Sequence, residues 1–168
     1  MVFYIVGALA LLARGTGVRL PYIAGALLLV GNVYLYSEIP LRDRGSLRMV
    51  VLDVRHGSCV FVEFPNGRTM LYDAGTRGYF DVGWHVIAPF LWQRGVRKID
   101  LVVVSHEDAD HFDALPFLME RFGVGRVLVN DHLLSSEEGR PLVDFIGSRG
   151  IKVEVVQEGV ELNGLGGA

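Results

Sequence analysis

Ser105-His106-Glu107-Asp108-Ala109-Asp110-His111 is the stretch on which the interpretation of this chain depends. It follows the apolar run Ile99 to Val104, which predicts a buried strand. Carboxylates crowded together resist ionising at the same time unless a cation lies among them. Two imidazoles and three carboxylates at the end of a strand are therefore a suitable ligand set for a divalent metal.

The spacing of four of these residues predicts two metal positions. His106 and Asp108 can point one way from an extended loop, while Asp110 and His111 turn towards a second position. Two divalent ions a few ångströms apart form the arrangement that hydrolyses phosphate esters. The alternative is a polar loop with two chance histidines, and Glu107 is expected to be a solvated neighbour.

The composition divides the chain into an apolar part and an acidic part. Hydrophobic residues make up 51% of the 168 residues, and Arg14 and Arg19 are the only charged residues of positions 1–36. The remainder carries 14 basic and 19 acidic residues, a formal charge of −5. Cys59 is the only cysteine, so neither an intrachain disulfide nor a cysteine-based zinc site is possible.

Two apolar runs, 1–13 and 20–36, flank the turn Arg14–Arg19 and predict a transmembrane helical hairpin over 1–36. A signal peptide or a buried soluble hairpin would be the alternatives, but the first run lacks a basic start. We expect a multi-pass membrane location, and the two arginines place the soluble domain outside the cytoplasm. The start within an apolar run suggests a piece of a larger membrane protein.

A linker over 37–46 and a domain over 47–168 follow. Strands are predicted at 47–54, 60–64, 69–72, 99–104, 127–129 and 151–156, with a hairpin turn at Asn66-Gly67. Helices are predicted at 82–94, capped by Asp81 and kinked at Pro89, at 114–122, capped by Asp113, and from Ser135 to before Gly150. This order is an α/β fold, suited to the N-terminal half of an αββα sandwich.

Four stretches together resemble a known family. They are Leu52 to Ser58, Phe64 to Thr69, Leu71 to Gly75 and Val104 to His111, and the last is similar to the HxHxDH motif of the metallo-β-lactamase superfamily. In this order they resemble the C-terminal metallo-β-lactamase-like domain of the ComEC family of competence DNA-uptake channels. The resemblance covers about residues 20–160 and includes the apolar hairpin.

The resemblance implies a set of roles for these residues. His106, Asp108, Asp110 and His111 would be metal ligands, with Asp110 and His111 also assigned as catalytic. Asp73 and Asp53 would support the ligands from behind, and His56 is a candidate for substrate contact or an exposed turn histidine. The cofactor would be a divalent metal, two ions in the complete protein. Zn²⁺ or Mn²⁺ is expected, because Asp108 replaces the usual histidine with a harder oxygen ligand.

The implied function is metal-dependent cleavage of the DNA strand that is not transported. The implied partners are the membrane, single-stranded DNA and other competence proteins. The alternatives are a non-catalytic module of a transporter and a hydrolase of another ester. Arg55, Asp113 and Ala114 depart from the family pattern, and the further ligands that the superfamily supplies downstream are not present. We therefore expect this chain alone to be catalytically incomplete, with an exposed sheet face around Leu101 and Val103.

Several other residues are expected to have structural roles. Asp113 is interpreted as a helix cap rather than a ligand, and Cys59 as a small buried hydrophobe rather than a nucleophile. His85 and His132 are expected on the surface.

Overall fold

The computed structural model describes residues 20–37 and 45–157. Contacts separate the chain into two units, Met1–Leu41 and Arg42–Ala168. The described part of the first unit is one helix, α2 (Leu20–Ser37), which confirms a helix in the second apolar run. The first run and the turn after it lie outside the described residues, so the hairpin remains a prediction.

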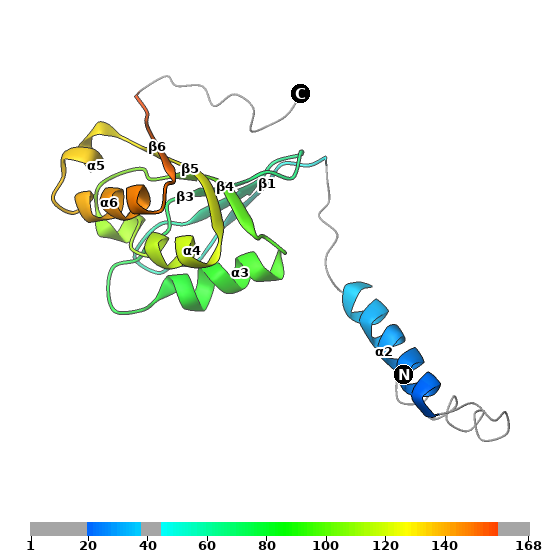
Figure 1. Cartoon of the computed structure of the whole chain (residues 1–168). Coiled ribbons are helices and arrows are strands. Elements are labelled where there is room, and N and C mark those ends of the chain that lie inside the picture. The colour runs from blue at the N-terminus through cyan, green and yellow to red at the C-terminus, as the bar shows by residue number, and fades with distance from the viewer. Residues whose placement is uncertain (1–19, 38–44, 158–168) are drawn as a thin grey trace. The chain divides into compact units, whose positions relative to one another are not determined.

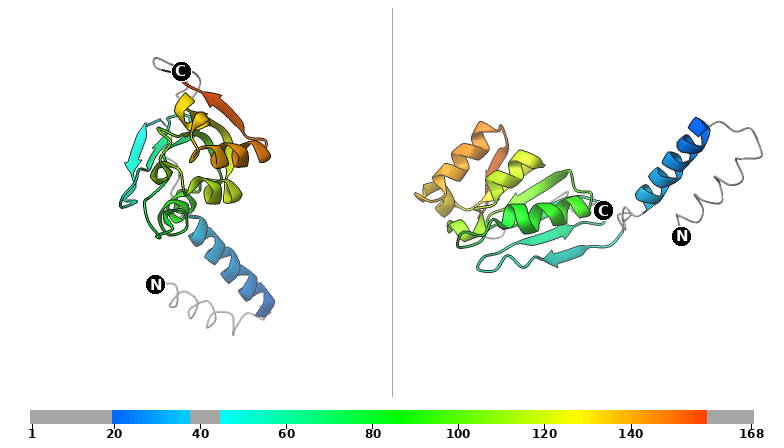
Figure 2. Two further views of the ribbon diagram at one scale, coloured as in Figure 1. Left: turned by 90° about the vertical axis from the view of Figure 1, so that its left-hand side faces the viewer. Right: turned by 90° about the horizontal axis from the view of Figure 1, so that it is seen from below.

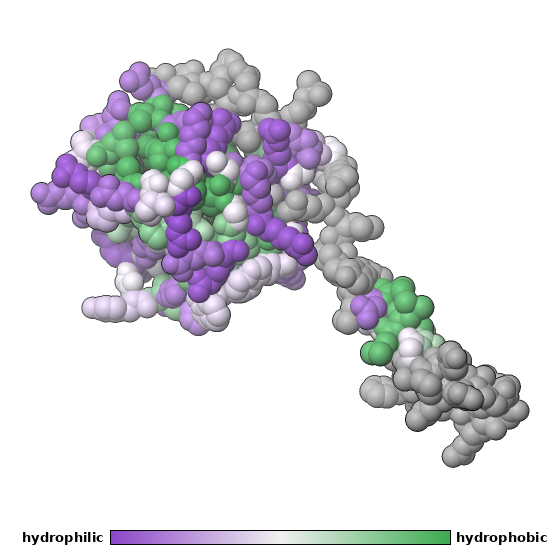
Figure 3. Space-filling view, in the orientation of Figure 1, coloured by the Kyte–Doolittle hydropathy of each residue, from purple (hydrophilic) through white to green (hydrophobic). Residues whose placement is uncertain are grey.

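The side chains of α2 are apolar and exposed where they are described. Leu28, Leu29 and Val33 are 70%, 67% and 62% exposed, and Figure 3 shows this part of the helix as mostly hydrophobic. Over the described residues, no helix meets the combined length and hydropathy required of a membrane span.

The second unit is built on one six-stranded sheet with the order β1-β2-β3-β4-β5-β6. The strands are β1 (Arg48–Val51), β2 (Val60–Glu63), β3 (Thr69–Tyr72), β4 (Lys98–Val103), β5 (Gly123–Val129) and β6 (Lys152–Val155). The first three strands are antiparallel, and β3 to β6 are parallel. The carboxyl ends of β3, β4 and β5 therefore lie along one edge of the sheet.

Helices cover one face of this sheet (Figures 1 and 2). They are η1 (Gly83–Ile87), which is a π-helix that continues into α3 (Ala88–Gln93), then α4 (Leu115–Arg121), α5 (Asp131–Ser135) and α6 (Arg140–Ser148). Their fully buried side chains pack against Phe61, Leu71 and Val102 of the sheet in the main core. The α/β fold class is confirmed, with one sheet and one helical layer described.

The opposite face of the sheet carries a smaller cluster around Leu101 and Leu128. Both are buried, at 0% and 1% exposure, so the expected exposure at Leu101 was wrong. The most exposed apolar side chains on this face are at the outer strand, where Met49 and Val51 are 69% and 71% exposed. Register pairs them with Val62 and Val60 of β2. The apolar surface of this face is thus most exposed on β1.

Two predicted strands differ from the observed ones by more than two residues in length. Strand β1 ends at Val51, and after one more bond, from the Leu52 N–H to the Cys59 carbonyl at 2.9 Å, the chain turns and the Val54 carbonyl accepts from Thr76 Oγ1 at 2.6 Å. Strand β5 was predicted too short, because its two glycines, Gly123 and Gly125, weaken the strand pattern in the sequence. A Cβ on Gly125 would lie 2.6 Å from the Asp100 carbonyl oxygen, so glycine here permits the close approach of β4.

The helical predictions also needed correction. Asp81 Oδ1 accepts from the Trp84 N–H at 2.8 Å, as expected of a cap, and the predicted break at Pro89 is a change from π- to α-helix at Ala88. Asp113 does not cap α4; its carboxylate accepts from the Thr76 N–H instead. The helix predicted to open at Ser135 begins only at Arg140, as α6, and a separate helix that was not predicted, α5, ends at Ser135 and is capped by Asn130.

Candidate metal centre

The candidate site lies where β3, β4 and β5 end. Asp73 directly follows β3, Ser105 to His111 follow β4, and Asn130 follows β5. Because ligands of open parallel sheets bind beyond the carboxyl ends of strands, this edge is the expected position for chemistry. Asn130 Nδ2 donates to the Ser105 carbonyl at 3.0 Å, so the start of the ligand loop is attached to the neighbouring strand end.

Asp73 is the buried acceptor beneath the ligand loop. Its side chain is 1% exposed, and its backbone has φ 57°, a conformation that aspartate tolerates better than most residues. Oδ1 accepts from the Ser105 N–H at 2.8 Å, and Oδ2 accepts from Ser105 Oγ at 2.7 Å. The carboxylate therefore holds the residue at which β4 becomes the loop.

The same carboxylate sets the tautomer of His111. Asp73 Oδ2 lies 2.8 Å from His111 Nδ1, and Ser105 Oγ lies 3.1 Å from it. A carboxylate can only accept, so Nδ1 carries the hydrogen in the neutral ring and the lone pair is on Nε2. A metal-binding histidine usually has its second nitrogen on a carboxylate in this way. His111 is thus prepared to ligate through Nε2.

His106 and Asp108 lie together on the outer side of the loop. His106 Nε2 is 3.1 Å from Asp108 Oδ2, and both side chains are nearly half exposed. The rings of His106 and His111 meet edge to face with centroids 4.5 Å apart. The two imidazoles predicted for different metal positions are therefore neighbours.

Asp110 completes the predicted ligand set. Its Oδ1 lies 3.8 Å from Arg77 Nη2, a long ion pair in which the arginine side chain is exposed and the Asp110 side chain is mostly buried. The backbone of Asp110 is closely packed, because a Cβ on Gly75 would lie 2.6 Å from its carbonyl carbon and oxygen. A Cβ on Gly57 would lie 2.7 Å from the same oxygen. Both glycines therefore permit three loops to meet at this residue.

The opening turn contacts the site through its backbone. The His56 carbonyl accepts from the Arg77 N–H at 2.6 Å, while the His56 side chain is exposed. Asp53 accepts from the Arg55 N–H of its own turn at 3.1 Å. The described contacts thus place Asp53 in a local turn, and its support of the ligands, like the substrate contact of His56, stays a prediction.

Asp113 links the ligand loop to the loop after β3. Its Oδ1 accepts from the Thr76 N–H at 3.0 Å. Partial burial raises the pKa of the Asp113 carboxyl above its ordinary value, although hydrogen bonds from the Thr76 and Ala114 N–H groups partly oppose this shift. A pocket of about 330 Å³ adjoins the loop, and its lining includes Arg77, Asp108, Asp110 and Glu138.

The other titratable residues near the motifs have the positions expected of residues with structural and not catalytic roles. Glu107 is partly exposed, and His85 and His132 are on the surface. Cys59 is 1% exposed, and burial, with the Asp73 charge as a second cause, raises the pKa of its thiol to about 12. The cysteine is therefore a buried hydrophobe, as predicted.

The described residues fit a metal centre only in part. Two imidazoles, one of them fixed by the buried Asp73, and the carboxylates of Asp108 and Asp110 are suitable donors. However, no three such side chains among the described residues converge on one point. With fewer than three protein ligands per ion, binding by these residues would be loose. The roles of Ser105, Thr76 and Asn130 were not predicted, although each polar residue follows closely after an apolar strand.

The chain belongs to the metallo-β-lactamase superfamily, whose family model matches residues 52–168. More particularly, it is 25% identical to ComE operon protein 3 of Bacillus subtilis, over 71% of this chain and 17% of that protein. It is 38% identical to competence protein ComA of Neisseria gonorrhoeae, over 61% of this chain and 14% of that protein. The predicted resemblance to the ComEC family is confirmed, and the chain spans about a sixth of the length of these relatives.

Among solved structures, one match is a diphosphatase of the PhnP family. It is 22% identical, covers 64% of this chain and 40% of the other, and gives a TM-score of 0.39.

Proposed function

We propose that this chain is the metal-dependent hydrolase domain of a membrane protein that takes up DNA, and that it cleaves phosphodiesters of the strand that is not transported. One observation carries the proposal: Asp73, Ser105 and His111 form a partly buried hydrogen-bond network that leaves His111 Nε2 free to ligate, on a loop with two imidazoles and two carboxylates. The similarity to two competence proteins supports DNA as the substrate.

His106 and Asp108 would hold one ion, and Asp110 and His111 the second, with further ligands from outside the described residues. When bound, a divalent metal supplies a Lewis acid and lowers the pKa of an attacking water. Asp73 would keep His111 in the tautomer that ligates, and Ser105 would hold both in position. Asp110 would be available as a ligand because its contact to Arg77 is long, at 3.8 Å.

The charge around the site bears on how DNA would bind. The pocket beside the ligand loop contains several carboxylates, with Arg77 as its cation. Protein affinity for nucleic acid comes mainly from phosphate contacts with lysine and arginine. Phosphates would therefore be held at this edge by the metals and Arg77.

The apolar helix supports the membrane part of the proposal. The described side chains of α2 include exposed leucines and valines, which need an apolar environment. We propose that α2 pairs with the preceding apolar run as a membrane hairpin of a multi-pass protein, with the hydrolase domain outside the cytoplasm. Other competence proteins would be its partners.

The identity of the metal follows from the ligand types. A carboxylate at Asp108 makes one position harder than a site of mostly imidazoles, so Mn²⁺ should serve at least as well as Zn²⁺.

A non-catalytic module of a transporter is the second candidate function. It is favoured by one observation, that three ligands do not converge within the described residues. In this case the metallo-β-lactamase fold would position DNA or stabilise the membrane part.

Cleavage by the complete gene product distinguishes these functions. Purified protein would be incubated with labelled single-stranded DNA and either Mn²⁺ or Zn²⁺. Metal-dependent cleavage should be lost in Asp110→Ala and in His111→Ala, while Tyr72→Leu, on the opposite sheet face, should keep it. A folded, metal-loaded protein that cleaves no DNA under any metal would favour the transporter module.

A further inference from the structure

A second surface with chemistry of its own lies on the helical layer. The aromatic patch consists of Trp84 and Trp92 on η1 and α3, together with Phe117 and Arg121 on α4. Both tryptophans are 49% exposed, which is unusual for such large apolar side chains. The mechanism proposed for the metal centre does not use them.

The rings of the patch form a continuous row. The centroid of Trp84 lies 5.8 Å from that of Phe117 and 6.4 Å from that of Trp92, and both pairs meet edge to face. Trp92 in turn lies 5.8 Å from the buried Phe122, which supports it from below. These contacts fix the exposed rings in place, so their ordering would cost little on binding.

A guanidinium accompanies these rings. Arg121 lies 3.7 Å from the centre of the Phe117 ring and 5.9 Å from that of Trp84. Its ion pair with Glu120 is 3.3 Å long and exposed, and such pairs contribute little in water. Arg121 therefore places a cation among the rings that can also contact an anion.

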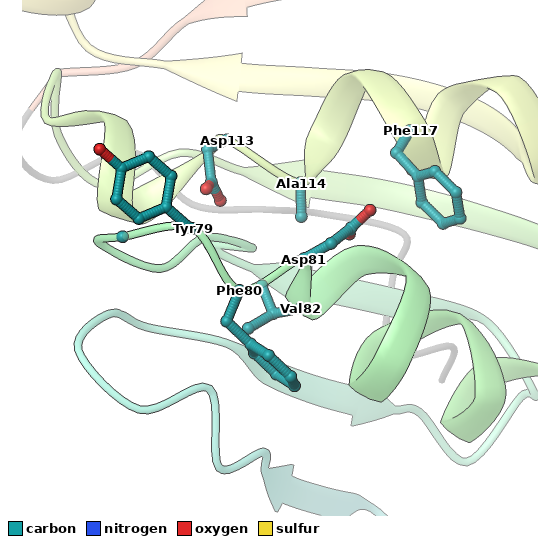
Figure 4. A pocket seen from close by; sticks show the side chains of 8 residues that line it. Tyr79, Phe80, Asp81, Val82, Asp113, Ala114 and Phe117 are labelled. Carbon is teal, nitrogen blue, oxygen red and sulfur yellow. The ribbon is translucent and has the colours of Figure 1, made fainter.

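The patch leads towards the candidate metal centre. Phe117 also lines a pocket of about 210 Å³ formed with Tyr79, Phe80 and Asp113 (Figure 4). This pocket shares Gly78 and Asp113 with the one that contains Asp108 and Asp110, so the two adjoin. On the far side, Arg55 lies 4.1 Å from the centre of the Phe80 ring. Rings and arginines thus continue from the patch to the ligand loop.

The carboxylates of the intervening pocket are already engaged. Asp81 Oδ1 accepts from the Trp84 N–H at 2.8 Å, and Asp113 Oδ1 accepts from the Thr76 N–H at 3.0 Å. Each contact offsets part of the negative charge that a phosphate would meet there.

From this arrangement we propose that the aromatic patch binds single-stranded nucleic acid and guides it to the metal centre. Unpaired bases stack on exposed aromatic rings, and arginine contacts the phosphates between them. A lipid surface also attracts tryptophan and arginine. However, the patch continues past Arg55 and Phe80 into two adjoining pockets, which a flexible single strand can follow and a flat bilayer surface cannot. The substrate class rests on the proposed function, but binding does not require the metal.

Both tryptophans of the chain lie in the patch, so intrinsic fluorescence reports on it directly. Oligothymidine would be titrated into the full chain in mild detergent with EDTA. Stacking should quench the tryptophan emission, and anisotropy of a labelled oligothymidine should give the affinity. Added salt should weaken binding because arginine contacts release counterions.

Substitutions then separate stacking from general apolar contact. Trp92→Leu keeps an apolar side chain but removes the ring, and it should weaken oligothymidine binding by roughly fivefold to a hundredfold. Trp92→Phe should keep most of the affinity. Tyr72→Leu is the matched control, because Tyr72 is 41% exposed on the opposite face of the sheet. Circular dichroism of each variant checks the fold.

The outcomes decide between the possible partners. Quenching by oligothymidine, its loss in Trp92→Leu and weaker binding of a blunt duplex would support the proposal. Equal binding by Trp92→Leu, or quenching by anionic phosphatidylglycerol vesicles and not by oligothymidine, would overturn it. DNA cleavage by a protein whose patch variants bind normally would overturn this proposal and leave the hydrolase function intact.

Discussion

Replacement of Asp73 by asparagine tests how the ligand loop is supported. Asparagine keeps the size of the side chain and tolerates the positive φ of 57°. Its Oδ1 can still accept from the Ser105 N–H, now 2.8 Å away. Its amide group cannot accept from His111 Nδ1, so the hydrogen of the ring would move to Nε2, the nitrogen that should bind metal.

The expected magnitude follows from the bonds lost. Hydrogen bonds to a buried charged group contribute about 1.5–3 kcal/mol each. The bond to a charged carboxylate is replaced at His111 by a weaker neutral bond in the reverse direction, and the Ser105 hydroxyl can turn to another acceptor, so Asp73→Asn should lower the free energy of unfolding by about 1.5–3 kcal/mol. Metal affinity should fall about tenfold to a hundredfold, as for other residues that orient a metal-binding histidine.

Urea denaturation followed by tryptophan fluorescence measures the first quantity, and Mn²⁺ titration measures the second. Asp100→Asn is the matched control, because Asp100 accepts from the Thr69 N–H at 2.9 Å at the opposite end of the strands. It should lower stability without changing metal affinity. If Asp73→Asn changed neither quantity, the account of Asp73 as the support of His111 would be wrong.

Three other predictions concern packing, reactivity and metal choice. Gly75→Ala should destabilise the domain by about 1–3 kcal/mol and weaken metal binding, because its Cβ would meet the Asp110 backbone at 2.6 Å. The control Gly147→Ala has open space around its Cβ in α6 and should stabilise the domain by about 0.5–1 kcal/mol; a Gly75→Ala variant more stable than Gly147→Ala in urea denaturation would refute this prediction. Cys59 should react with a thiol reagent only on unfolding, because it is buried and its pKa of about 12 keeps the thiol protonated; rapid labelling of the native chain would contradict this. The stability that this group contributes should be fully present below pH 9.0 and lost as the pH rises towards 12. Asp108→His should move the metal preference from Mn²⁺ towards Zn²⁺, which competition titrations would detect.

Much of the fold could be predicted from the sequence, because apolar runs alternate with turns rich in glycine and polar residues. The strand 69–72 was predicted with its observed bounds, since a hairpin turn and Asp73 mark its two ends. Strand β5 was predicted too short because Gly123 and Gly125 weaken the local pattern, and only the approach of Asp100 shows why glycine is needed. Tertiary packing therefore decided what the local pattern could not.

The sequence indicated the ligand loop, and the family resemblance indicated Asp73 behind it, but neither gave the geometry of the site. The type and spacing of His106, Asp108 and His111 are visible in the sequence. The bond from His111 to Asp73 spans 38 positions, and only the parallel pairing of β3 and β4 brings these residues together. The prediction that Asp113 caps the following helix was wrong for a similar reason. Its carboxylate accepts a hydrogen bond from Thr76, in a loop distant in sequence, and not from the helix that follows.

The central claim is that the loop Ser105 to His111 binds a divalent metal. The most direct measurement titrates Mn²⁺ into the isotope-labelled full chain and follows paramagnetic broadening of backbone amide resonances. The account predicts that the amides of His106, Asp108, Asp110 and His111 broaden first, and that His111→Ala abolishes this selectivity. Broadening that begins at Glu137 and Glu138 instead, or that persists unchanged in His111→Ala, would contradict it.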